Sequence, residues 1–183
     1  MSELTTHLIE PEDLDAMLNM DNLVIVDLSH PALYQQRHVP GAVHLAGSAL
    51  MANQPPALGK HPEFKDIEML VSNLGIDDSK HVVVYDDEGG GWAGRLAWTL
   101  DLIGLNNWSY LNGGIVAWIN EGHMTESTVN APKRCSAEIG STFANPSAVI
   151  HANEIIAKLD SSDFAVWDAR SPVSYTHLRA HET

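Results

Sequence analysis

The chain has 183 residues and a formal net charge of −14 at pH 7, from 10 basic and 24 acidic residues. A surface this acidic repels nucleic acid and anionic membranes, so neither is an expected partner. The single cysteine, Cys135, excludes an internal disulfide and a CxxC metal site. Because the first residues lack signal-peptide features and no apolar run approaches the roughly 20 residues of a membrane span, we expect a soluble cytoplasmic protein.

The first 125 residues alternate between helix and strand patterns. Continuous apolar runs, "LVIVDL" and "HVVVYD", are typical of strands buried on both faces. In chain order we expect a helix over 11–18, a strand over 23–28, a short helix before the Pro40–Gly41 turn, a helix over 61–76, a strand over 81–86, a helix over 91–105, a short strand and turn over 108–114 and a helix over 115–122. This alternation predicts an α/β domain with a central, mostly parallel sheet flanked by helices.

The pattern restarts near residue 149. Residues 8–34 align without a gap on residues 149–175, so that Asp27 meets Asp168 and Tyr34 meets Tyr175. Between them, residues 126–148 are rich in Ser, Thr, Pro and Asn, which is typical of a linker. We therefore predict a domain over 1–125, a linker over 126–148 and the start of a second copy over 149–183. The alternative is a chance match of two unrelated helix–strand units.

The second copy stops early, because "THLRAHET" follows Tyr175 where "RHVPGAVHL" follows the equivalent tyrosine of the first copy. About 35 residues cannot bury a core of their own. We expect a truncated second domain whose last several residues are foreign to the natural reading frame; whether the residues after about 172 belong to the natural protein stays open.

The segment "DDEGGGWAGR" contains the G-x-G-x-x-G spacing of a dinucleotide site at Gly89, Gly91 and Gly94. Three acidic residues precede these glycines where a diphosphate would bind, and no acid ends the next strand. A tight turn into a helix explains the glycines equally well. We therefore expect no cofactor here.

Three longer blocks occur in a fixed order: "IVDLSHPALYQQRHVPGAVHL", "HVVVYDDEGGGWAGRLAWTLDLIGL" and "WSYLNGGIVAWINEGH". Together they resemble the N-terminal domain of tandem-domain thiosulfate sulfurtransferases, or rhodaneses. "FAVWDARSPVSY" resembles the opening of the second, catalytic domain of that family. The resemblance implies a rhodanese-like fold followed by an incomplete second copy.

In the catalytic copy of that family, the loop after the "VVVY" strand begins with a cysteine that carries sulfane sulfur as a persulfide. The resemblance places that position on Asp86, and a carboxylate cannot carry a persulfide. We expect no catalytic residue in this chain and a degenerate active loop made of Asp86, Asp87, Glu88, Gly89, Gly90, Gly91 and Arg95. Within it, Asp86 is expected to cap the loop's N–H groups, and Arg95 to pair with the neighbouring acids.

Other candidate residues are weaker. We expect Cys135 to be an ordinary linker thiol, although Lys133 and Arg134 would lower its pKa somewhat. His38 and His44 are expected to be turn and surface residues rather than acid–base catalysts. A last group has the spacing of helical metal ligands but lies in the suspect tail, so no metal site is expected from it: His177, His181 and Glu182.

Two functions remain open. The resemblance implies a sulfurtransferase in the intact two-domain protein, with thiosulfate or 3-mercaptopyruvate as donor and cyanide or a thiol as acceptor. The present chain would then lack the nucleophile and be inactive alone, so it is not assigned as an enzyme by itself. The alternative is a non-catalytic rhodanese-fold module that binds or scaffolds a partner. The restart at residue 149 favours the first hypothesis.

Overall fold

A computed structural model describes residues 7–136 and 139–167 of the chain. It divides into two compact units, Met1–Pro146 and Ser147–Thr183, which are treated separately below. Among the described residues, none of the helices is long and apolar enough to cross a membrane.

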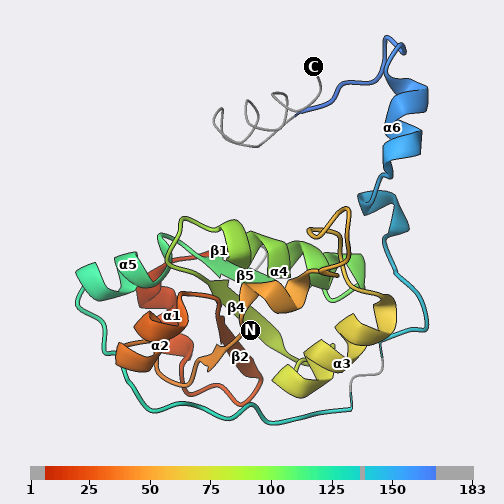
Figure 1. Ribbon diagram of the computed structural model, residues 1–183. Helices are drawn as coiled ribbons and strands as arrows, with labels where there is room; N and C mark the ends of the chain where they lie inside the picture. Colours follow the sequence, from red (N-terminus) through yellow and green to blue (C-terminus); the bar gives the residue numbers. More distant parts are fainter. Residues whose placement is uncertain (1–6, 137–138, 168–183) are drawn as a thin grey trace. The chain divides into compact units, whose positions relative to one another are not determined.

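The first unit is built on a five-stranded sheet in which every pairing is parallel. Its order is β1-β5-β4-β2-β3, and β4 and β2 lie side by side near its centre (Figure 1). The strands are β1 (Leu8–Ile9), β2 (Leu23–Asp27), β3 (Val43–His44), β4 (His81–Tyr85) and β5 (Trp108–Leu111). The predicted parallel α/β architecture is confirmed, and β1 is an addition that the sequence pattern did not reveal, since two residues carry no periodicity.

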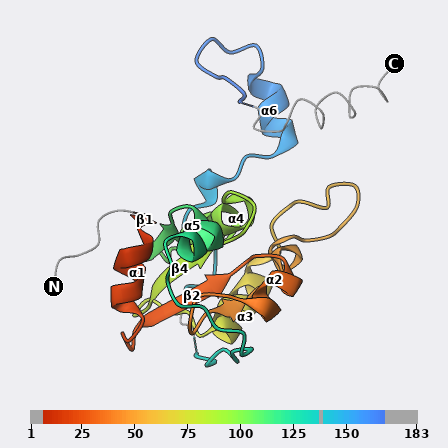
Figure 2. The same ribbon diagram turned by 90° about the vertical axis from the view of Figure 1, so that its left-hand side faces the viewer.

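Helices cover both faces of this sheet (Figures 1 and 2). They are α1 (Pro11–Met17), α2 (Pro31–Gln36), α3 (Phe64–Leu74), α4 (Gly91–Leu102) and α5 (Gly114–Asn120), with a 3-10 turn, η1 (Gly47–Leu50). Buried residues of α3 and α4 pack on Val26 and Val84 from one side of the sheet. Residues of α1 and α5 pack on Ile25, Val83 and Tyr85 from the other side. The two cores follow from strand alternation, because neighbouring residues of a strand face opposite sides.

The carboxyl ends of β2 and β4 lie side by side, and the chain segments that follow them go to opposite faces of the sheet. Helix α4 follows β4 onto one face, while Leu33 of α2, which follows β2, packs on the other face. In open α/β sheets, ligand sites favour such switch points.

The segment predicted as a linker lies along the first unit. Glu126 forms an antiparallel bridge with His38, and the N–H of Cys135 donates to the carbonyl of Ser72 at 3.0 Å. The N–H of Asn145 donates to the carbonyl of Leu102 at 3.2 Å. These contacts attach Glu126, Cys135 and Asn145 to three different parts of the domain.

The second unit begins with η2 (Pro146–Ala148), which spans the boundary, and continues into α6 (Ala152–Lys158). At the start of α6 the N–H of His151 donates to the Glu154 carboxylate at 2.9 Å. The alignment of 8–34 on 149–175 places the counterpart of β2 at residues 164–168, but residues 164–167 form no strand, because a lone strand has no neighbour for its backbone hydrogen bonds. Asp168 and Tyr175 lie outside the described residues.

Candidate functional site

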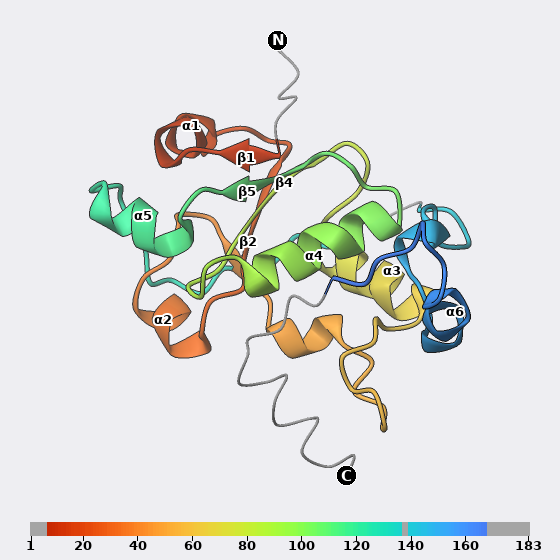
Figure 3. The same cartoon turned by 90° about the horizontal axis from the view of Figure 1, so that it is seen from above.

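The loop between β4 and α4 converges on one carboxylate, that of Asp86 (Figure 3 shows the two elements it joins). Oδ1 accepts the N–H groups of Glu88 at 3.1 Å and Gly90 at 2.8 Å. Oδ2 accepts those of Trp92 and Ala93, both at 3.0 Å. Asp86 is only 1% exposed, so these four donors provide the polar surroundings that a buried carboxylate requires. The prediction that Asp86 caps the loop is confirmed.

Two glycines allow the loop to curl around that carboxylate. Gly89 and Gly90 have φ angles of +84° and +97°, a region that side-chain-bearing residues rarely adopt. The first N–H groups of the 12-residue helix α4 then point toward residue 86, where the helix dipole also favours negative charge. The geometry is that of an anion-binding cradle occupied by the chain's own side chain.

The turn after β5 closes the cradle from a second side. Gly114 has a φ of +57°, and a Cβ there would lie 2.3 Å from the carbonyl oxygen of Asp86. The N–H of Ile115 donates to that same carbonyl at 3.2 Å. The "LNGG" motif is thus explained by a close backbone approach to the loop.

The remaining loop residues do not all behave as expected. Arg95 was expected to pair with the neighbouring acids, and this was wrong. Its guanidinium instead donates to the carbonyls of Leu50 at 3.2 Å and Gly59 at 2.9 Å, and stacks 4.7 Å from the ring centroid of Trp98. Helix α4 begins at Gly91, so Arg95 lies about one helical turn beyond the acidic residues of the loop. Its side chain therefore reaches Leu50 of η1 instead of those acids.

The other two acids of the loop lie outside the cradle. The Asp87 carboxylate accepts the N–H of His30 at 3.2 Å and thereby links the loop to the start of α2. Glu88 is exposed, and only its backbone N–H takes part in the cradle. Neither of these side chains accepts any of the four N–H groups that bind Asp86.

A second buried pair lies just behind the cradle, and sequence reasoning missed it. Asp27 and Tyr85 are paired across β2 and β4, and both are fully buried. The Tyr85 hydroxyl donates to Oδ2 of Asp27 at 2.6 Å and accepts the N–H of Val39 at 3.1 Å. Burial raises the pKa of Asp27, although hydrogen bonds from Tyr85 and Ser29 oppose it. The sequence did contain a signal for this pair, because the apolar runs "LVIVD" and "HVVVY" end in Asp27 and Tyr85. Equivalent ends of two neighbouring parallel strands lie side by side.

The histidines flanking "VPGAV" serve the fold. His38 was expected at a surface turn but is fully buried, with Nδ1 at 2.6 Å from the carbonyl of Tyr34 and Nε2 at 3.4 Å from Glu126. His44 is half-buried, and its Nε2 lies 2.9 Å from the carbonyl of Ser29. The difference for His38 arises because residues 126–130 fold back over it.

Cys135 lies apart from the cradle. Its thiol donates to the carbonyl of Ile76 at 3.3 Å. Burial and the neighbouring carboxylate of Asp77 raise the pKa of this thiol. The expected lowering by Lys133 and Arg134 was wrong, because the Arg134 guanidinium binds the side chain of Asn73 instead.

No described residues form a group of three or more side chains able to hold a metal ion. His177, His181 and Glu182 lie outside the described residues. A dinucleotide is also disfavoured at the glycine loop, because Asp86 already binds the four N–H groups that a pyrophosphate would need.

The cradle, the parallel sheet and the order of motifs can be compared with known proteins. Residues 10–121 match the Rhodanese-like domain family. The chain belongs to the rhodanese family. It is 41% identical over 167 residues to a thiosulfate sulfurtransferase of Azotobacter vinelandii, and equally to one of Pseudomonas aeruginosa. Each of these alignments covers 91% of this chain.

The rhodanese fold is also found in a crystal structure of a 3-mercaptopyruvate sulfotransferase from Escherichia coli. The two folds agree with a TM-score of 0.82 at 24% identity, over 93% of this chain and 68% of that one. The present chain spans 60% of the length of the two bacterial thiosulfate sulfurtransferases.

Proposed function

We propose that this chain is the N-terminal, non-catalytic part of a tandem-domain sulfurtransferase. In its intact form the protein moves sulfane sulfur through a cysteine persulfide, from a small-molecule donor to a thiophilic acceptor such as cyanide or a thiol. The chain alone lacks that cysteine and is inactive. A cytoplasmic location is part of this proposal, and the single cysteine supports it, since proteins of oxidising compartments often carry disulfides.

The observation that carries the proposal is the set of four N–H groups around residue 86. Such donors stabilise an anionic side chain, and with cysteine in that place they would lower its pKa and hold a persulfide. By family resemblance, residue 86 is the position of the catalytic cysteine. Because Asp86 stands there, this copy keeps the cradle without the nucleophile.

Two features support a second copy that starts after the linker. In the ungapped alignment of residues 8–34 with 149–175, helix α1 (Pro11–Met17) coincides with helix α6 (Ala152–Lys158). Two residues buried in β2 have exposed counterparts in the second copy: Ile25 (4%) aligns on Val166 (56%), and Val26 (0%) aligns on Trp167 (94%). Exposed apolar residues at core positions are expected where the rest of a domain would cover them.

The thiosulfate sulfurtransferases that are 41% identical favour thiosulfate as donor over 3-mercaptopyruvate. The test compares sulfur transfer to cyanide by the 183-residue chain and by the product of its gene read beyond the codon for Arg170. Both proteins are assayed with each donor. We expect transfer only by the longer product, with one added sulfur atom on a cysteine in its second copy. Turnover by the 183-residue chain, with that sulfur on Cys135, would contradict the proposal.

The alternative function is a non-catalytic rhodanese-fold module that binds or scaffolds a partner. The lack of a nucleophile at Asp86 favours it. A gene whose frame closes after Thr183, with a stable 183-residue product in the cell, would move this alternative ahead of the first.

A further inference from the structure

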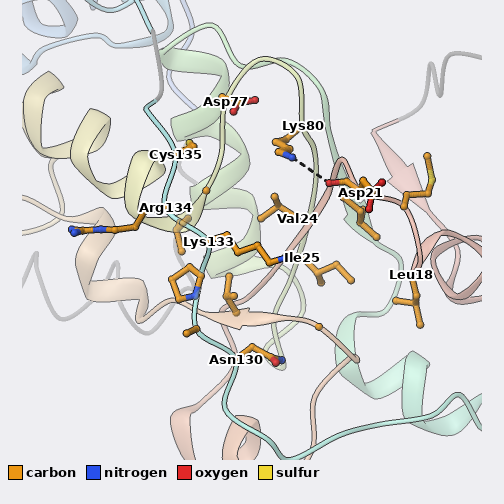
Figure 4. A pocket seen from close by; sticks show the side chains of 18 of the residues that line it. Leu18, Asp21, Val24, Ile25, Asp77, Lys80, Asn130, Lys133, Arg134 and Cys135 are labelled. Atoms are coloured by element: carbon orange, nitrogen blue, oxygen red, sulfur yellow. Dashed lines mark hydrogen bonds between the residues drawn. The ribbon is translucent and has the colours of Figure 1, made fainter.

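A cavity of about 630 Å³, whose lining residues are drawn in Figure 4, lies within the first unit at the amino-terminal ends of β2 and β4. Its wall includes residues that immediately precede β2, from Leu18 to Asp21, and residues that precede β4, Asp77 and Lys80. In a parallel sheet the amino ends of the strands share one edge, so this cavity is separate from the cradle at the carboxyl ends. Its volume is within the usual range of small-molecule sites.

The cavity exists because β3 is short. Strand β3 pairs only with Val26 and Asp27 of β2. On the side of β2 that faces β3, residues 23–25 therefore have no neighbouring strand in the described part of the chain. Residues 130–135 cross this gap, held by Asn130 at the carbonyl of Ala42 and by Cys135 at the carbonyl of Ser72. The opening between them and β2 is the cavity.

The wall combines an apolar floor with a charged rim. The floor is formed by Leu18, Leu23, Val24, Ile25, Val43 and Leu74. The rim contains three cations, Lys80, Lys133 and Arg134, and two carboxylates, those of Asp21 and Asp77. The Arg134 guanidinium already donates to the side chain of Asn73. Such a surface suits a ligand with an apolar body and one charged group.

The charges on the rim are not equally available. The Asp77 carboxylate already accepts both the N–H and the hydroxyl of Ser79. The Lys80 ammonium uses one proton on the carbonyl of Asp21, at 3.2 Å, and has two more. Asp21 is exposed at the outer rim.

Lys133 has neither a hydrogen-bond nor an ion-pair partner for its ammonium among residues 7–136 and 139–167. Figure 4 shows its side chain extending into the cavity toward Ile25, whereas Arg134 points away. Asp21 and Lys133 are both exposed, but it is the Lys133 side chain that extends over the apolar part of the wall, so the charge directed there is positive.

We propose that this cavity binds a small organic anion with an apolar body, of the medium-chain carboxylate type. The hydrocarbon part packs on Leu23 and Val24, which are only half-buried, and the anionic group binds the ammonium groups of Lys133 and Lys80. The site is independent of the proposed sulfur transfer, since it uses neither the Asp86 loop nor a second copy.

Cys135 provides the readout, because it lines the cavity and is the only thiol of the chain. The rate of alkylation of Cys135 by N-ethylmaleimide is measured in the 183-residue chain with increasing octanoate. We expect saturable protection by octanoate, weaker protection by neutral octanamide, and none by octylammonium. N-acetylcysteine serves as the free thiol that octanoate must not protect.

Lys133→Gln should weaken octanoate binding roughly tenfold, because a charge-assisted hydrogen bond is lost. Lys60→Gln is the matched control, since Lys60 is exposed and absent from the cavity wall, and it should leave binding unchanged. The proposal is overturned by a lack of protection, by equal protection from the three probes, or by equal effects of the two lysine variants.

Discussion

The hydroxyl of Tyr85 donates a 2.6 Å hydrogen bond to Oδ2 of Asp27, between two adjacent strands and out of contact with solvent. The same hydroxyl accepts the N–H of Val39. Tyr85→Phe removes both contacts and leaves Oδ2 of Asp27 and the N–H of Val39 without a hydrogen bond, while Oδ1 of Asp27 keeps the N–H of Ser29. We expect the free energy of unfolding to fall by about 2–3 kcal/mol, measured by urea denaturation. Tyr110→Phe is the control and should change it by less than about 0.5 kcal/mol, because the Tyr110 hydroxyl has no hydrogen bond within the described residues.

The pH dependence of stability tests the same pair. Burial raises the pKa of Asp27 in the folded state, so the folded protein holds this proton more tightly than the unfolded chain does. The stabilisation that protonated Asp27 gives the folded state is fully present below the pKa of Asp27 in the unfolded chain. It is lost as the pH rises through the higher pKa of Asp27 in the folded protein. The stability of wild type relative to Asp27→Asn should therefore decrease from about pH 4 upward. A difference that is constant with pH, or that grows in favour of wild type, would contradict this assignment.

Asp86 is predicted to be a structural residue of its loop. Asp86→Ala leaves four N–H groups without their acceptor and should lower the free energy of unfolding by on the order of 3 kcal/mol. Asp86→Asn should also be costly, because an amide N–H₂ would face the N–H groups of either Trp92 and Ala93 or Glu88 and Gly90. Asp87→Ala, with one hydrogen bond to lose, should cost less than about 1 kcal/mol. Equal effects at both positions would argue against the cradle.

The cradle should also act on a thiol. In an Asp86→Cys, Cys135→Ser variant, the pKa of the new thiol should lie below that of Cys135 in wild type. The N–H donors and the start of α4 favour a thiolate at residue 86, whereas burial and Asp77 raise the pKa of Cys135. Each protein has one thiol, so thiolate absorbance in the ultraviolet can be titrated without ambiguity. A higher pKa at residue 86 would remove the main physical support for the proposed function.

Glu126 should hold residues 126–130 against the domain. Its Oε1 accepts the N–H of Gly41 and the side-chain amide of Asn130, both at 2.6 Å. Burial alone would raise the pKa of Glu126, but these hydrogen bonds and the nearby His38 more than offset it and lower the pKa. Glu126→Gln should cost about 1 kcal/mol near neutral pH.

The pKa of Glu126 is lower in the folded protein than in the unfolded chain. Ionised Glu126 therefore stabilises the fold fully above its pKa in the unfolded chain, and this stabilisation is lost as the pH falls through its pKa in the folded protein. The difference between wild type and Glu126→Gln should therefore vanish in acid. Glu121→Gln is a suitable control, since this carboxylate has only a 3.9 Å contact with His123. A Glu126 effect that persists at low pH would indicate a steric rather than an ionic cause.

The α/β architecture could be predicted from the sequence, because the apolar patterns of strands and helices can be seen within short stretches of the chain. The runs that form β2 and β4 are apolar throughout, and the heptad-like spacing of Phe64, Ile67, Val71 and Leu74 marks α3. Strand β1 escaped notice because its two residues gain their conformation from pairing with β5. That pairing brings together residues about 100 positions apart.

The candidate site was predicted in part for the same reason. Asp86 acts on residues within seven positions of itself, so its capping role could be derived from the loop sequence. Arg95, His38 and Cys135 could not be placed in this way, because their partners Leu50, Glu126 and Asp77 lie 45 or more residues away in sequence. The cavity at the other edge depends on a missing strand neighbour, which no local pattern encodes.

The exposure of Trp167 has a practical consequence. It is 94% exposed, while Trp118 is fully buried and the other three tryptophans, Trp92, Trp98 and Trp108, are half-buried. Its fluorescence should therefore be quenched by iodide far more readily than that of the four indoles of the first unit. One spectrum with and without quencher then reports on the two units separately, and loss of the iodide-accessible component would signal that something has covered the second.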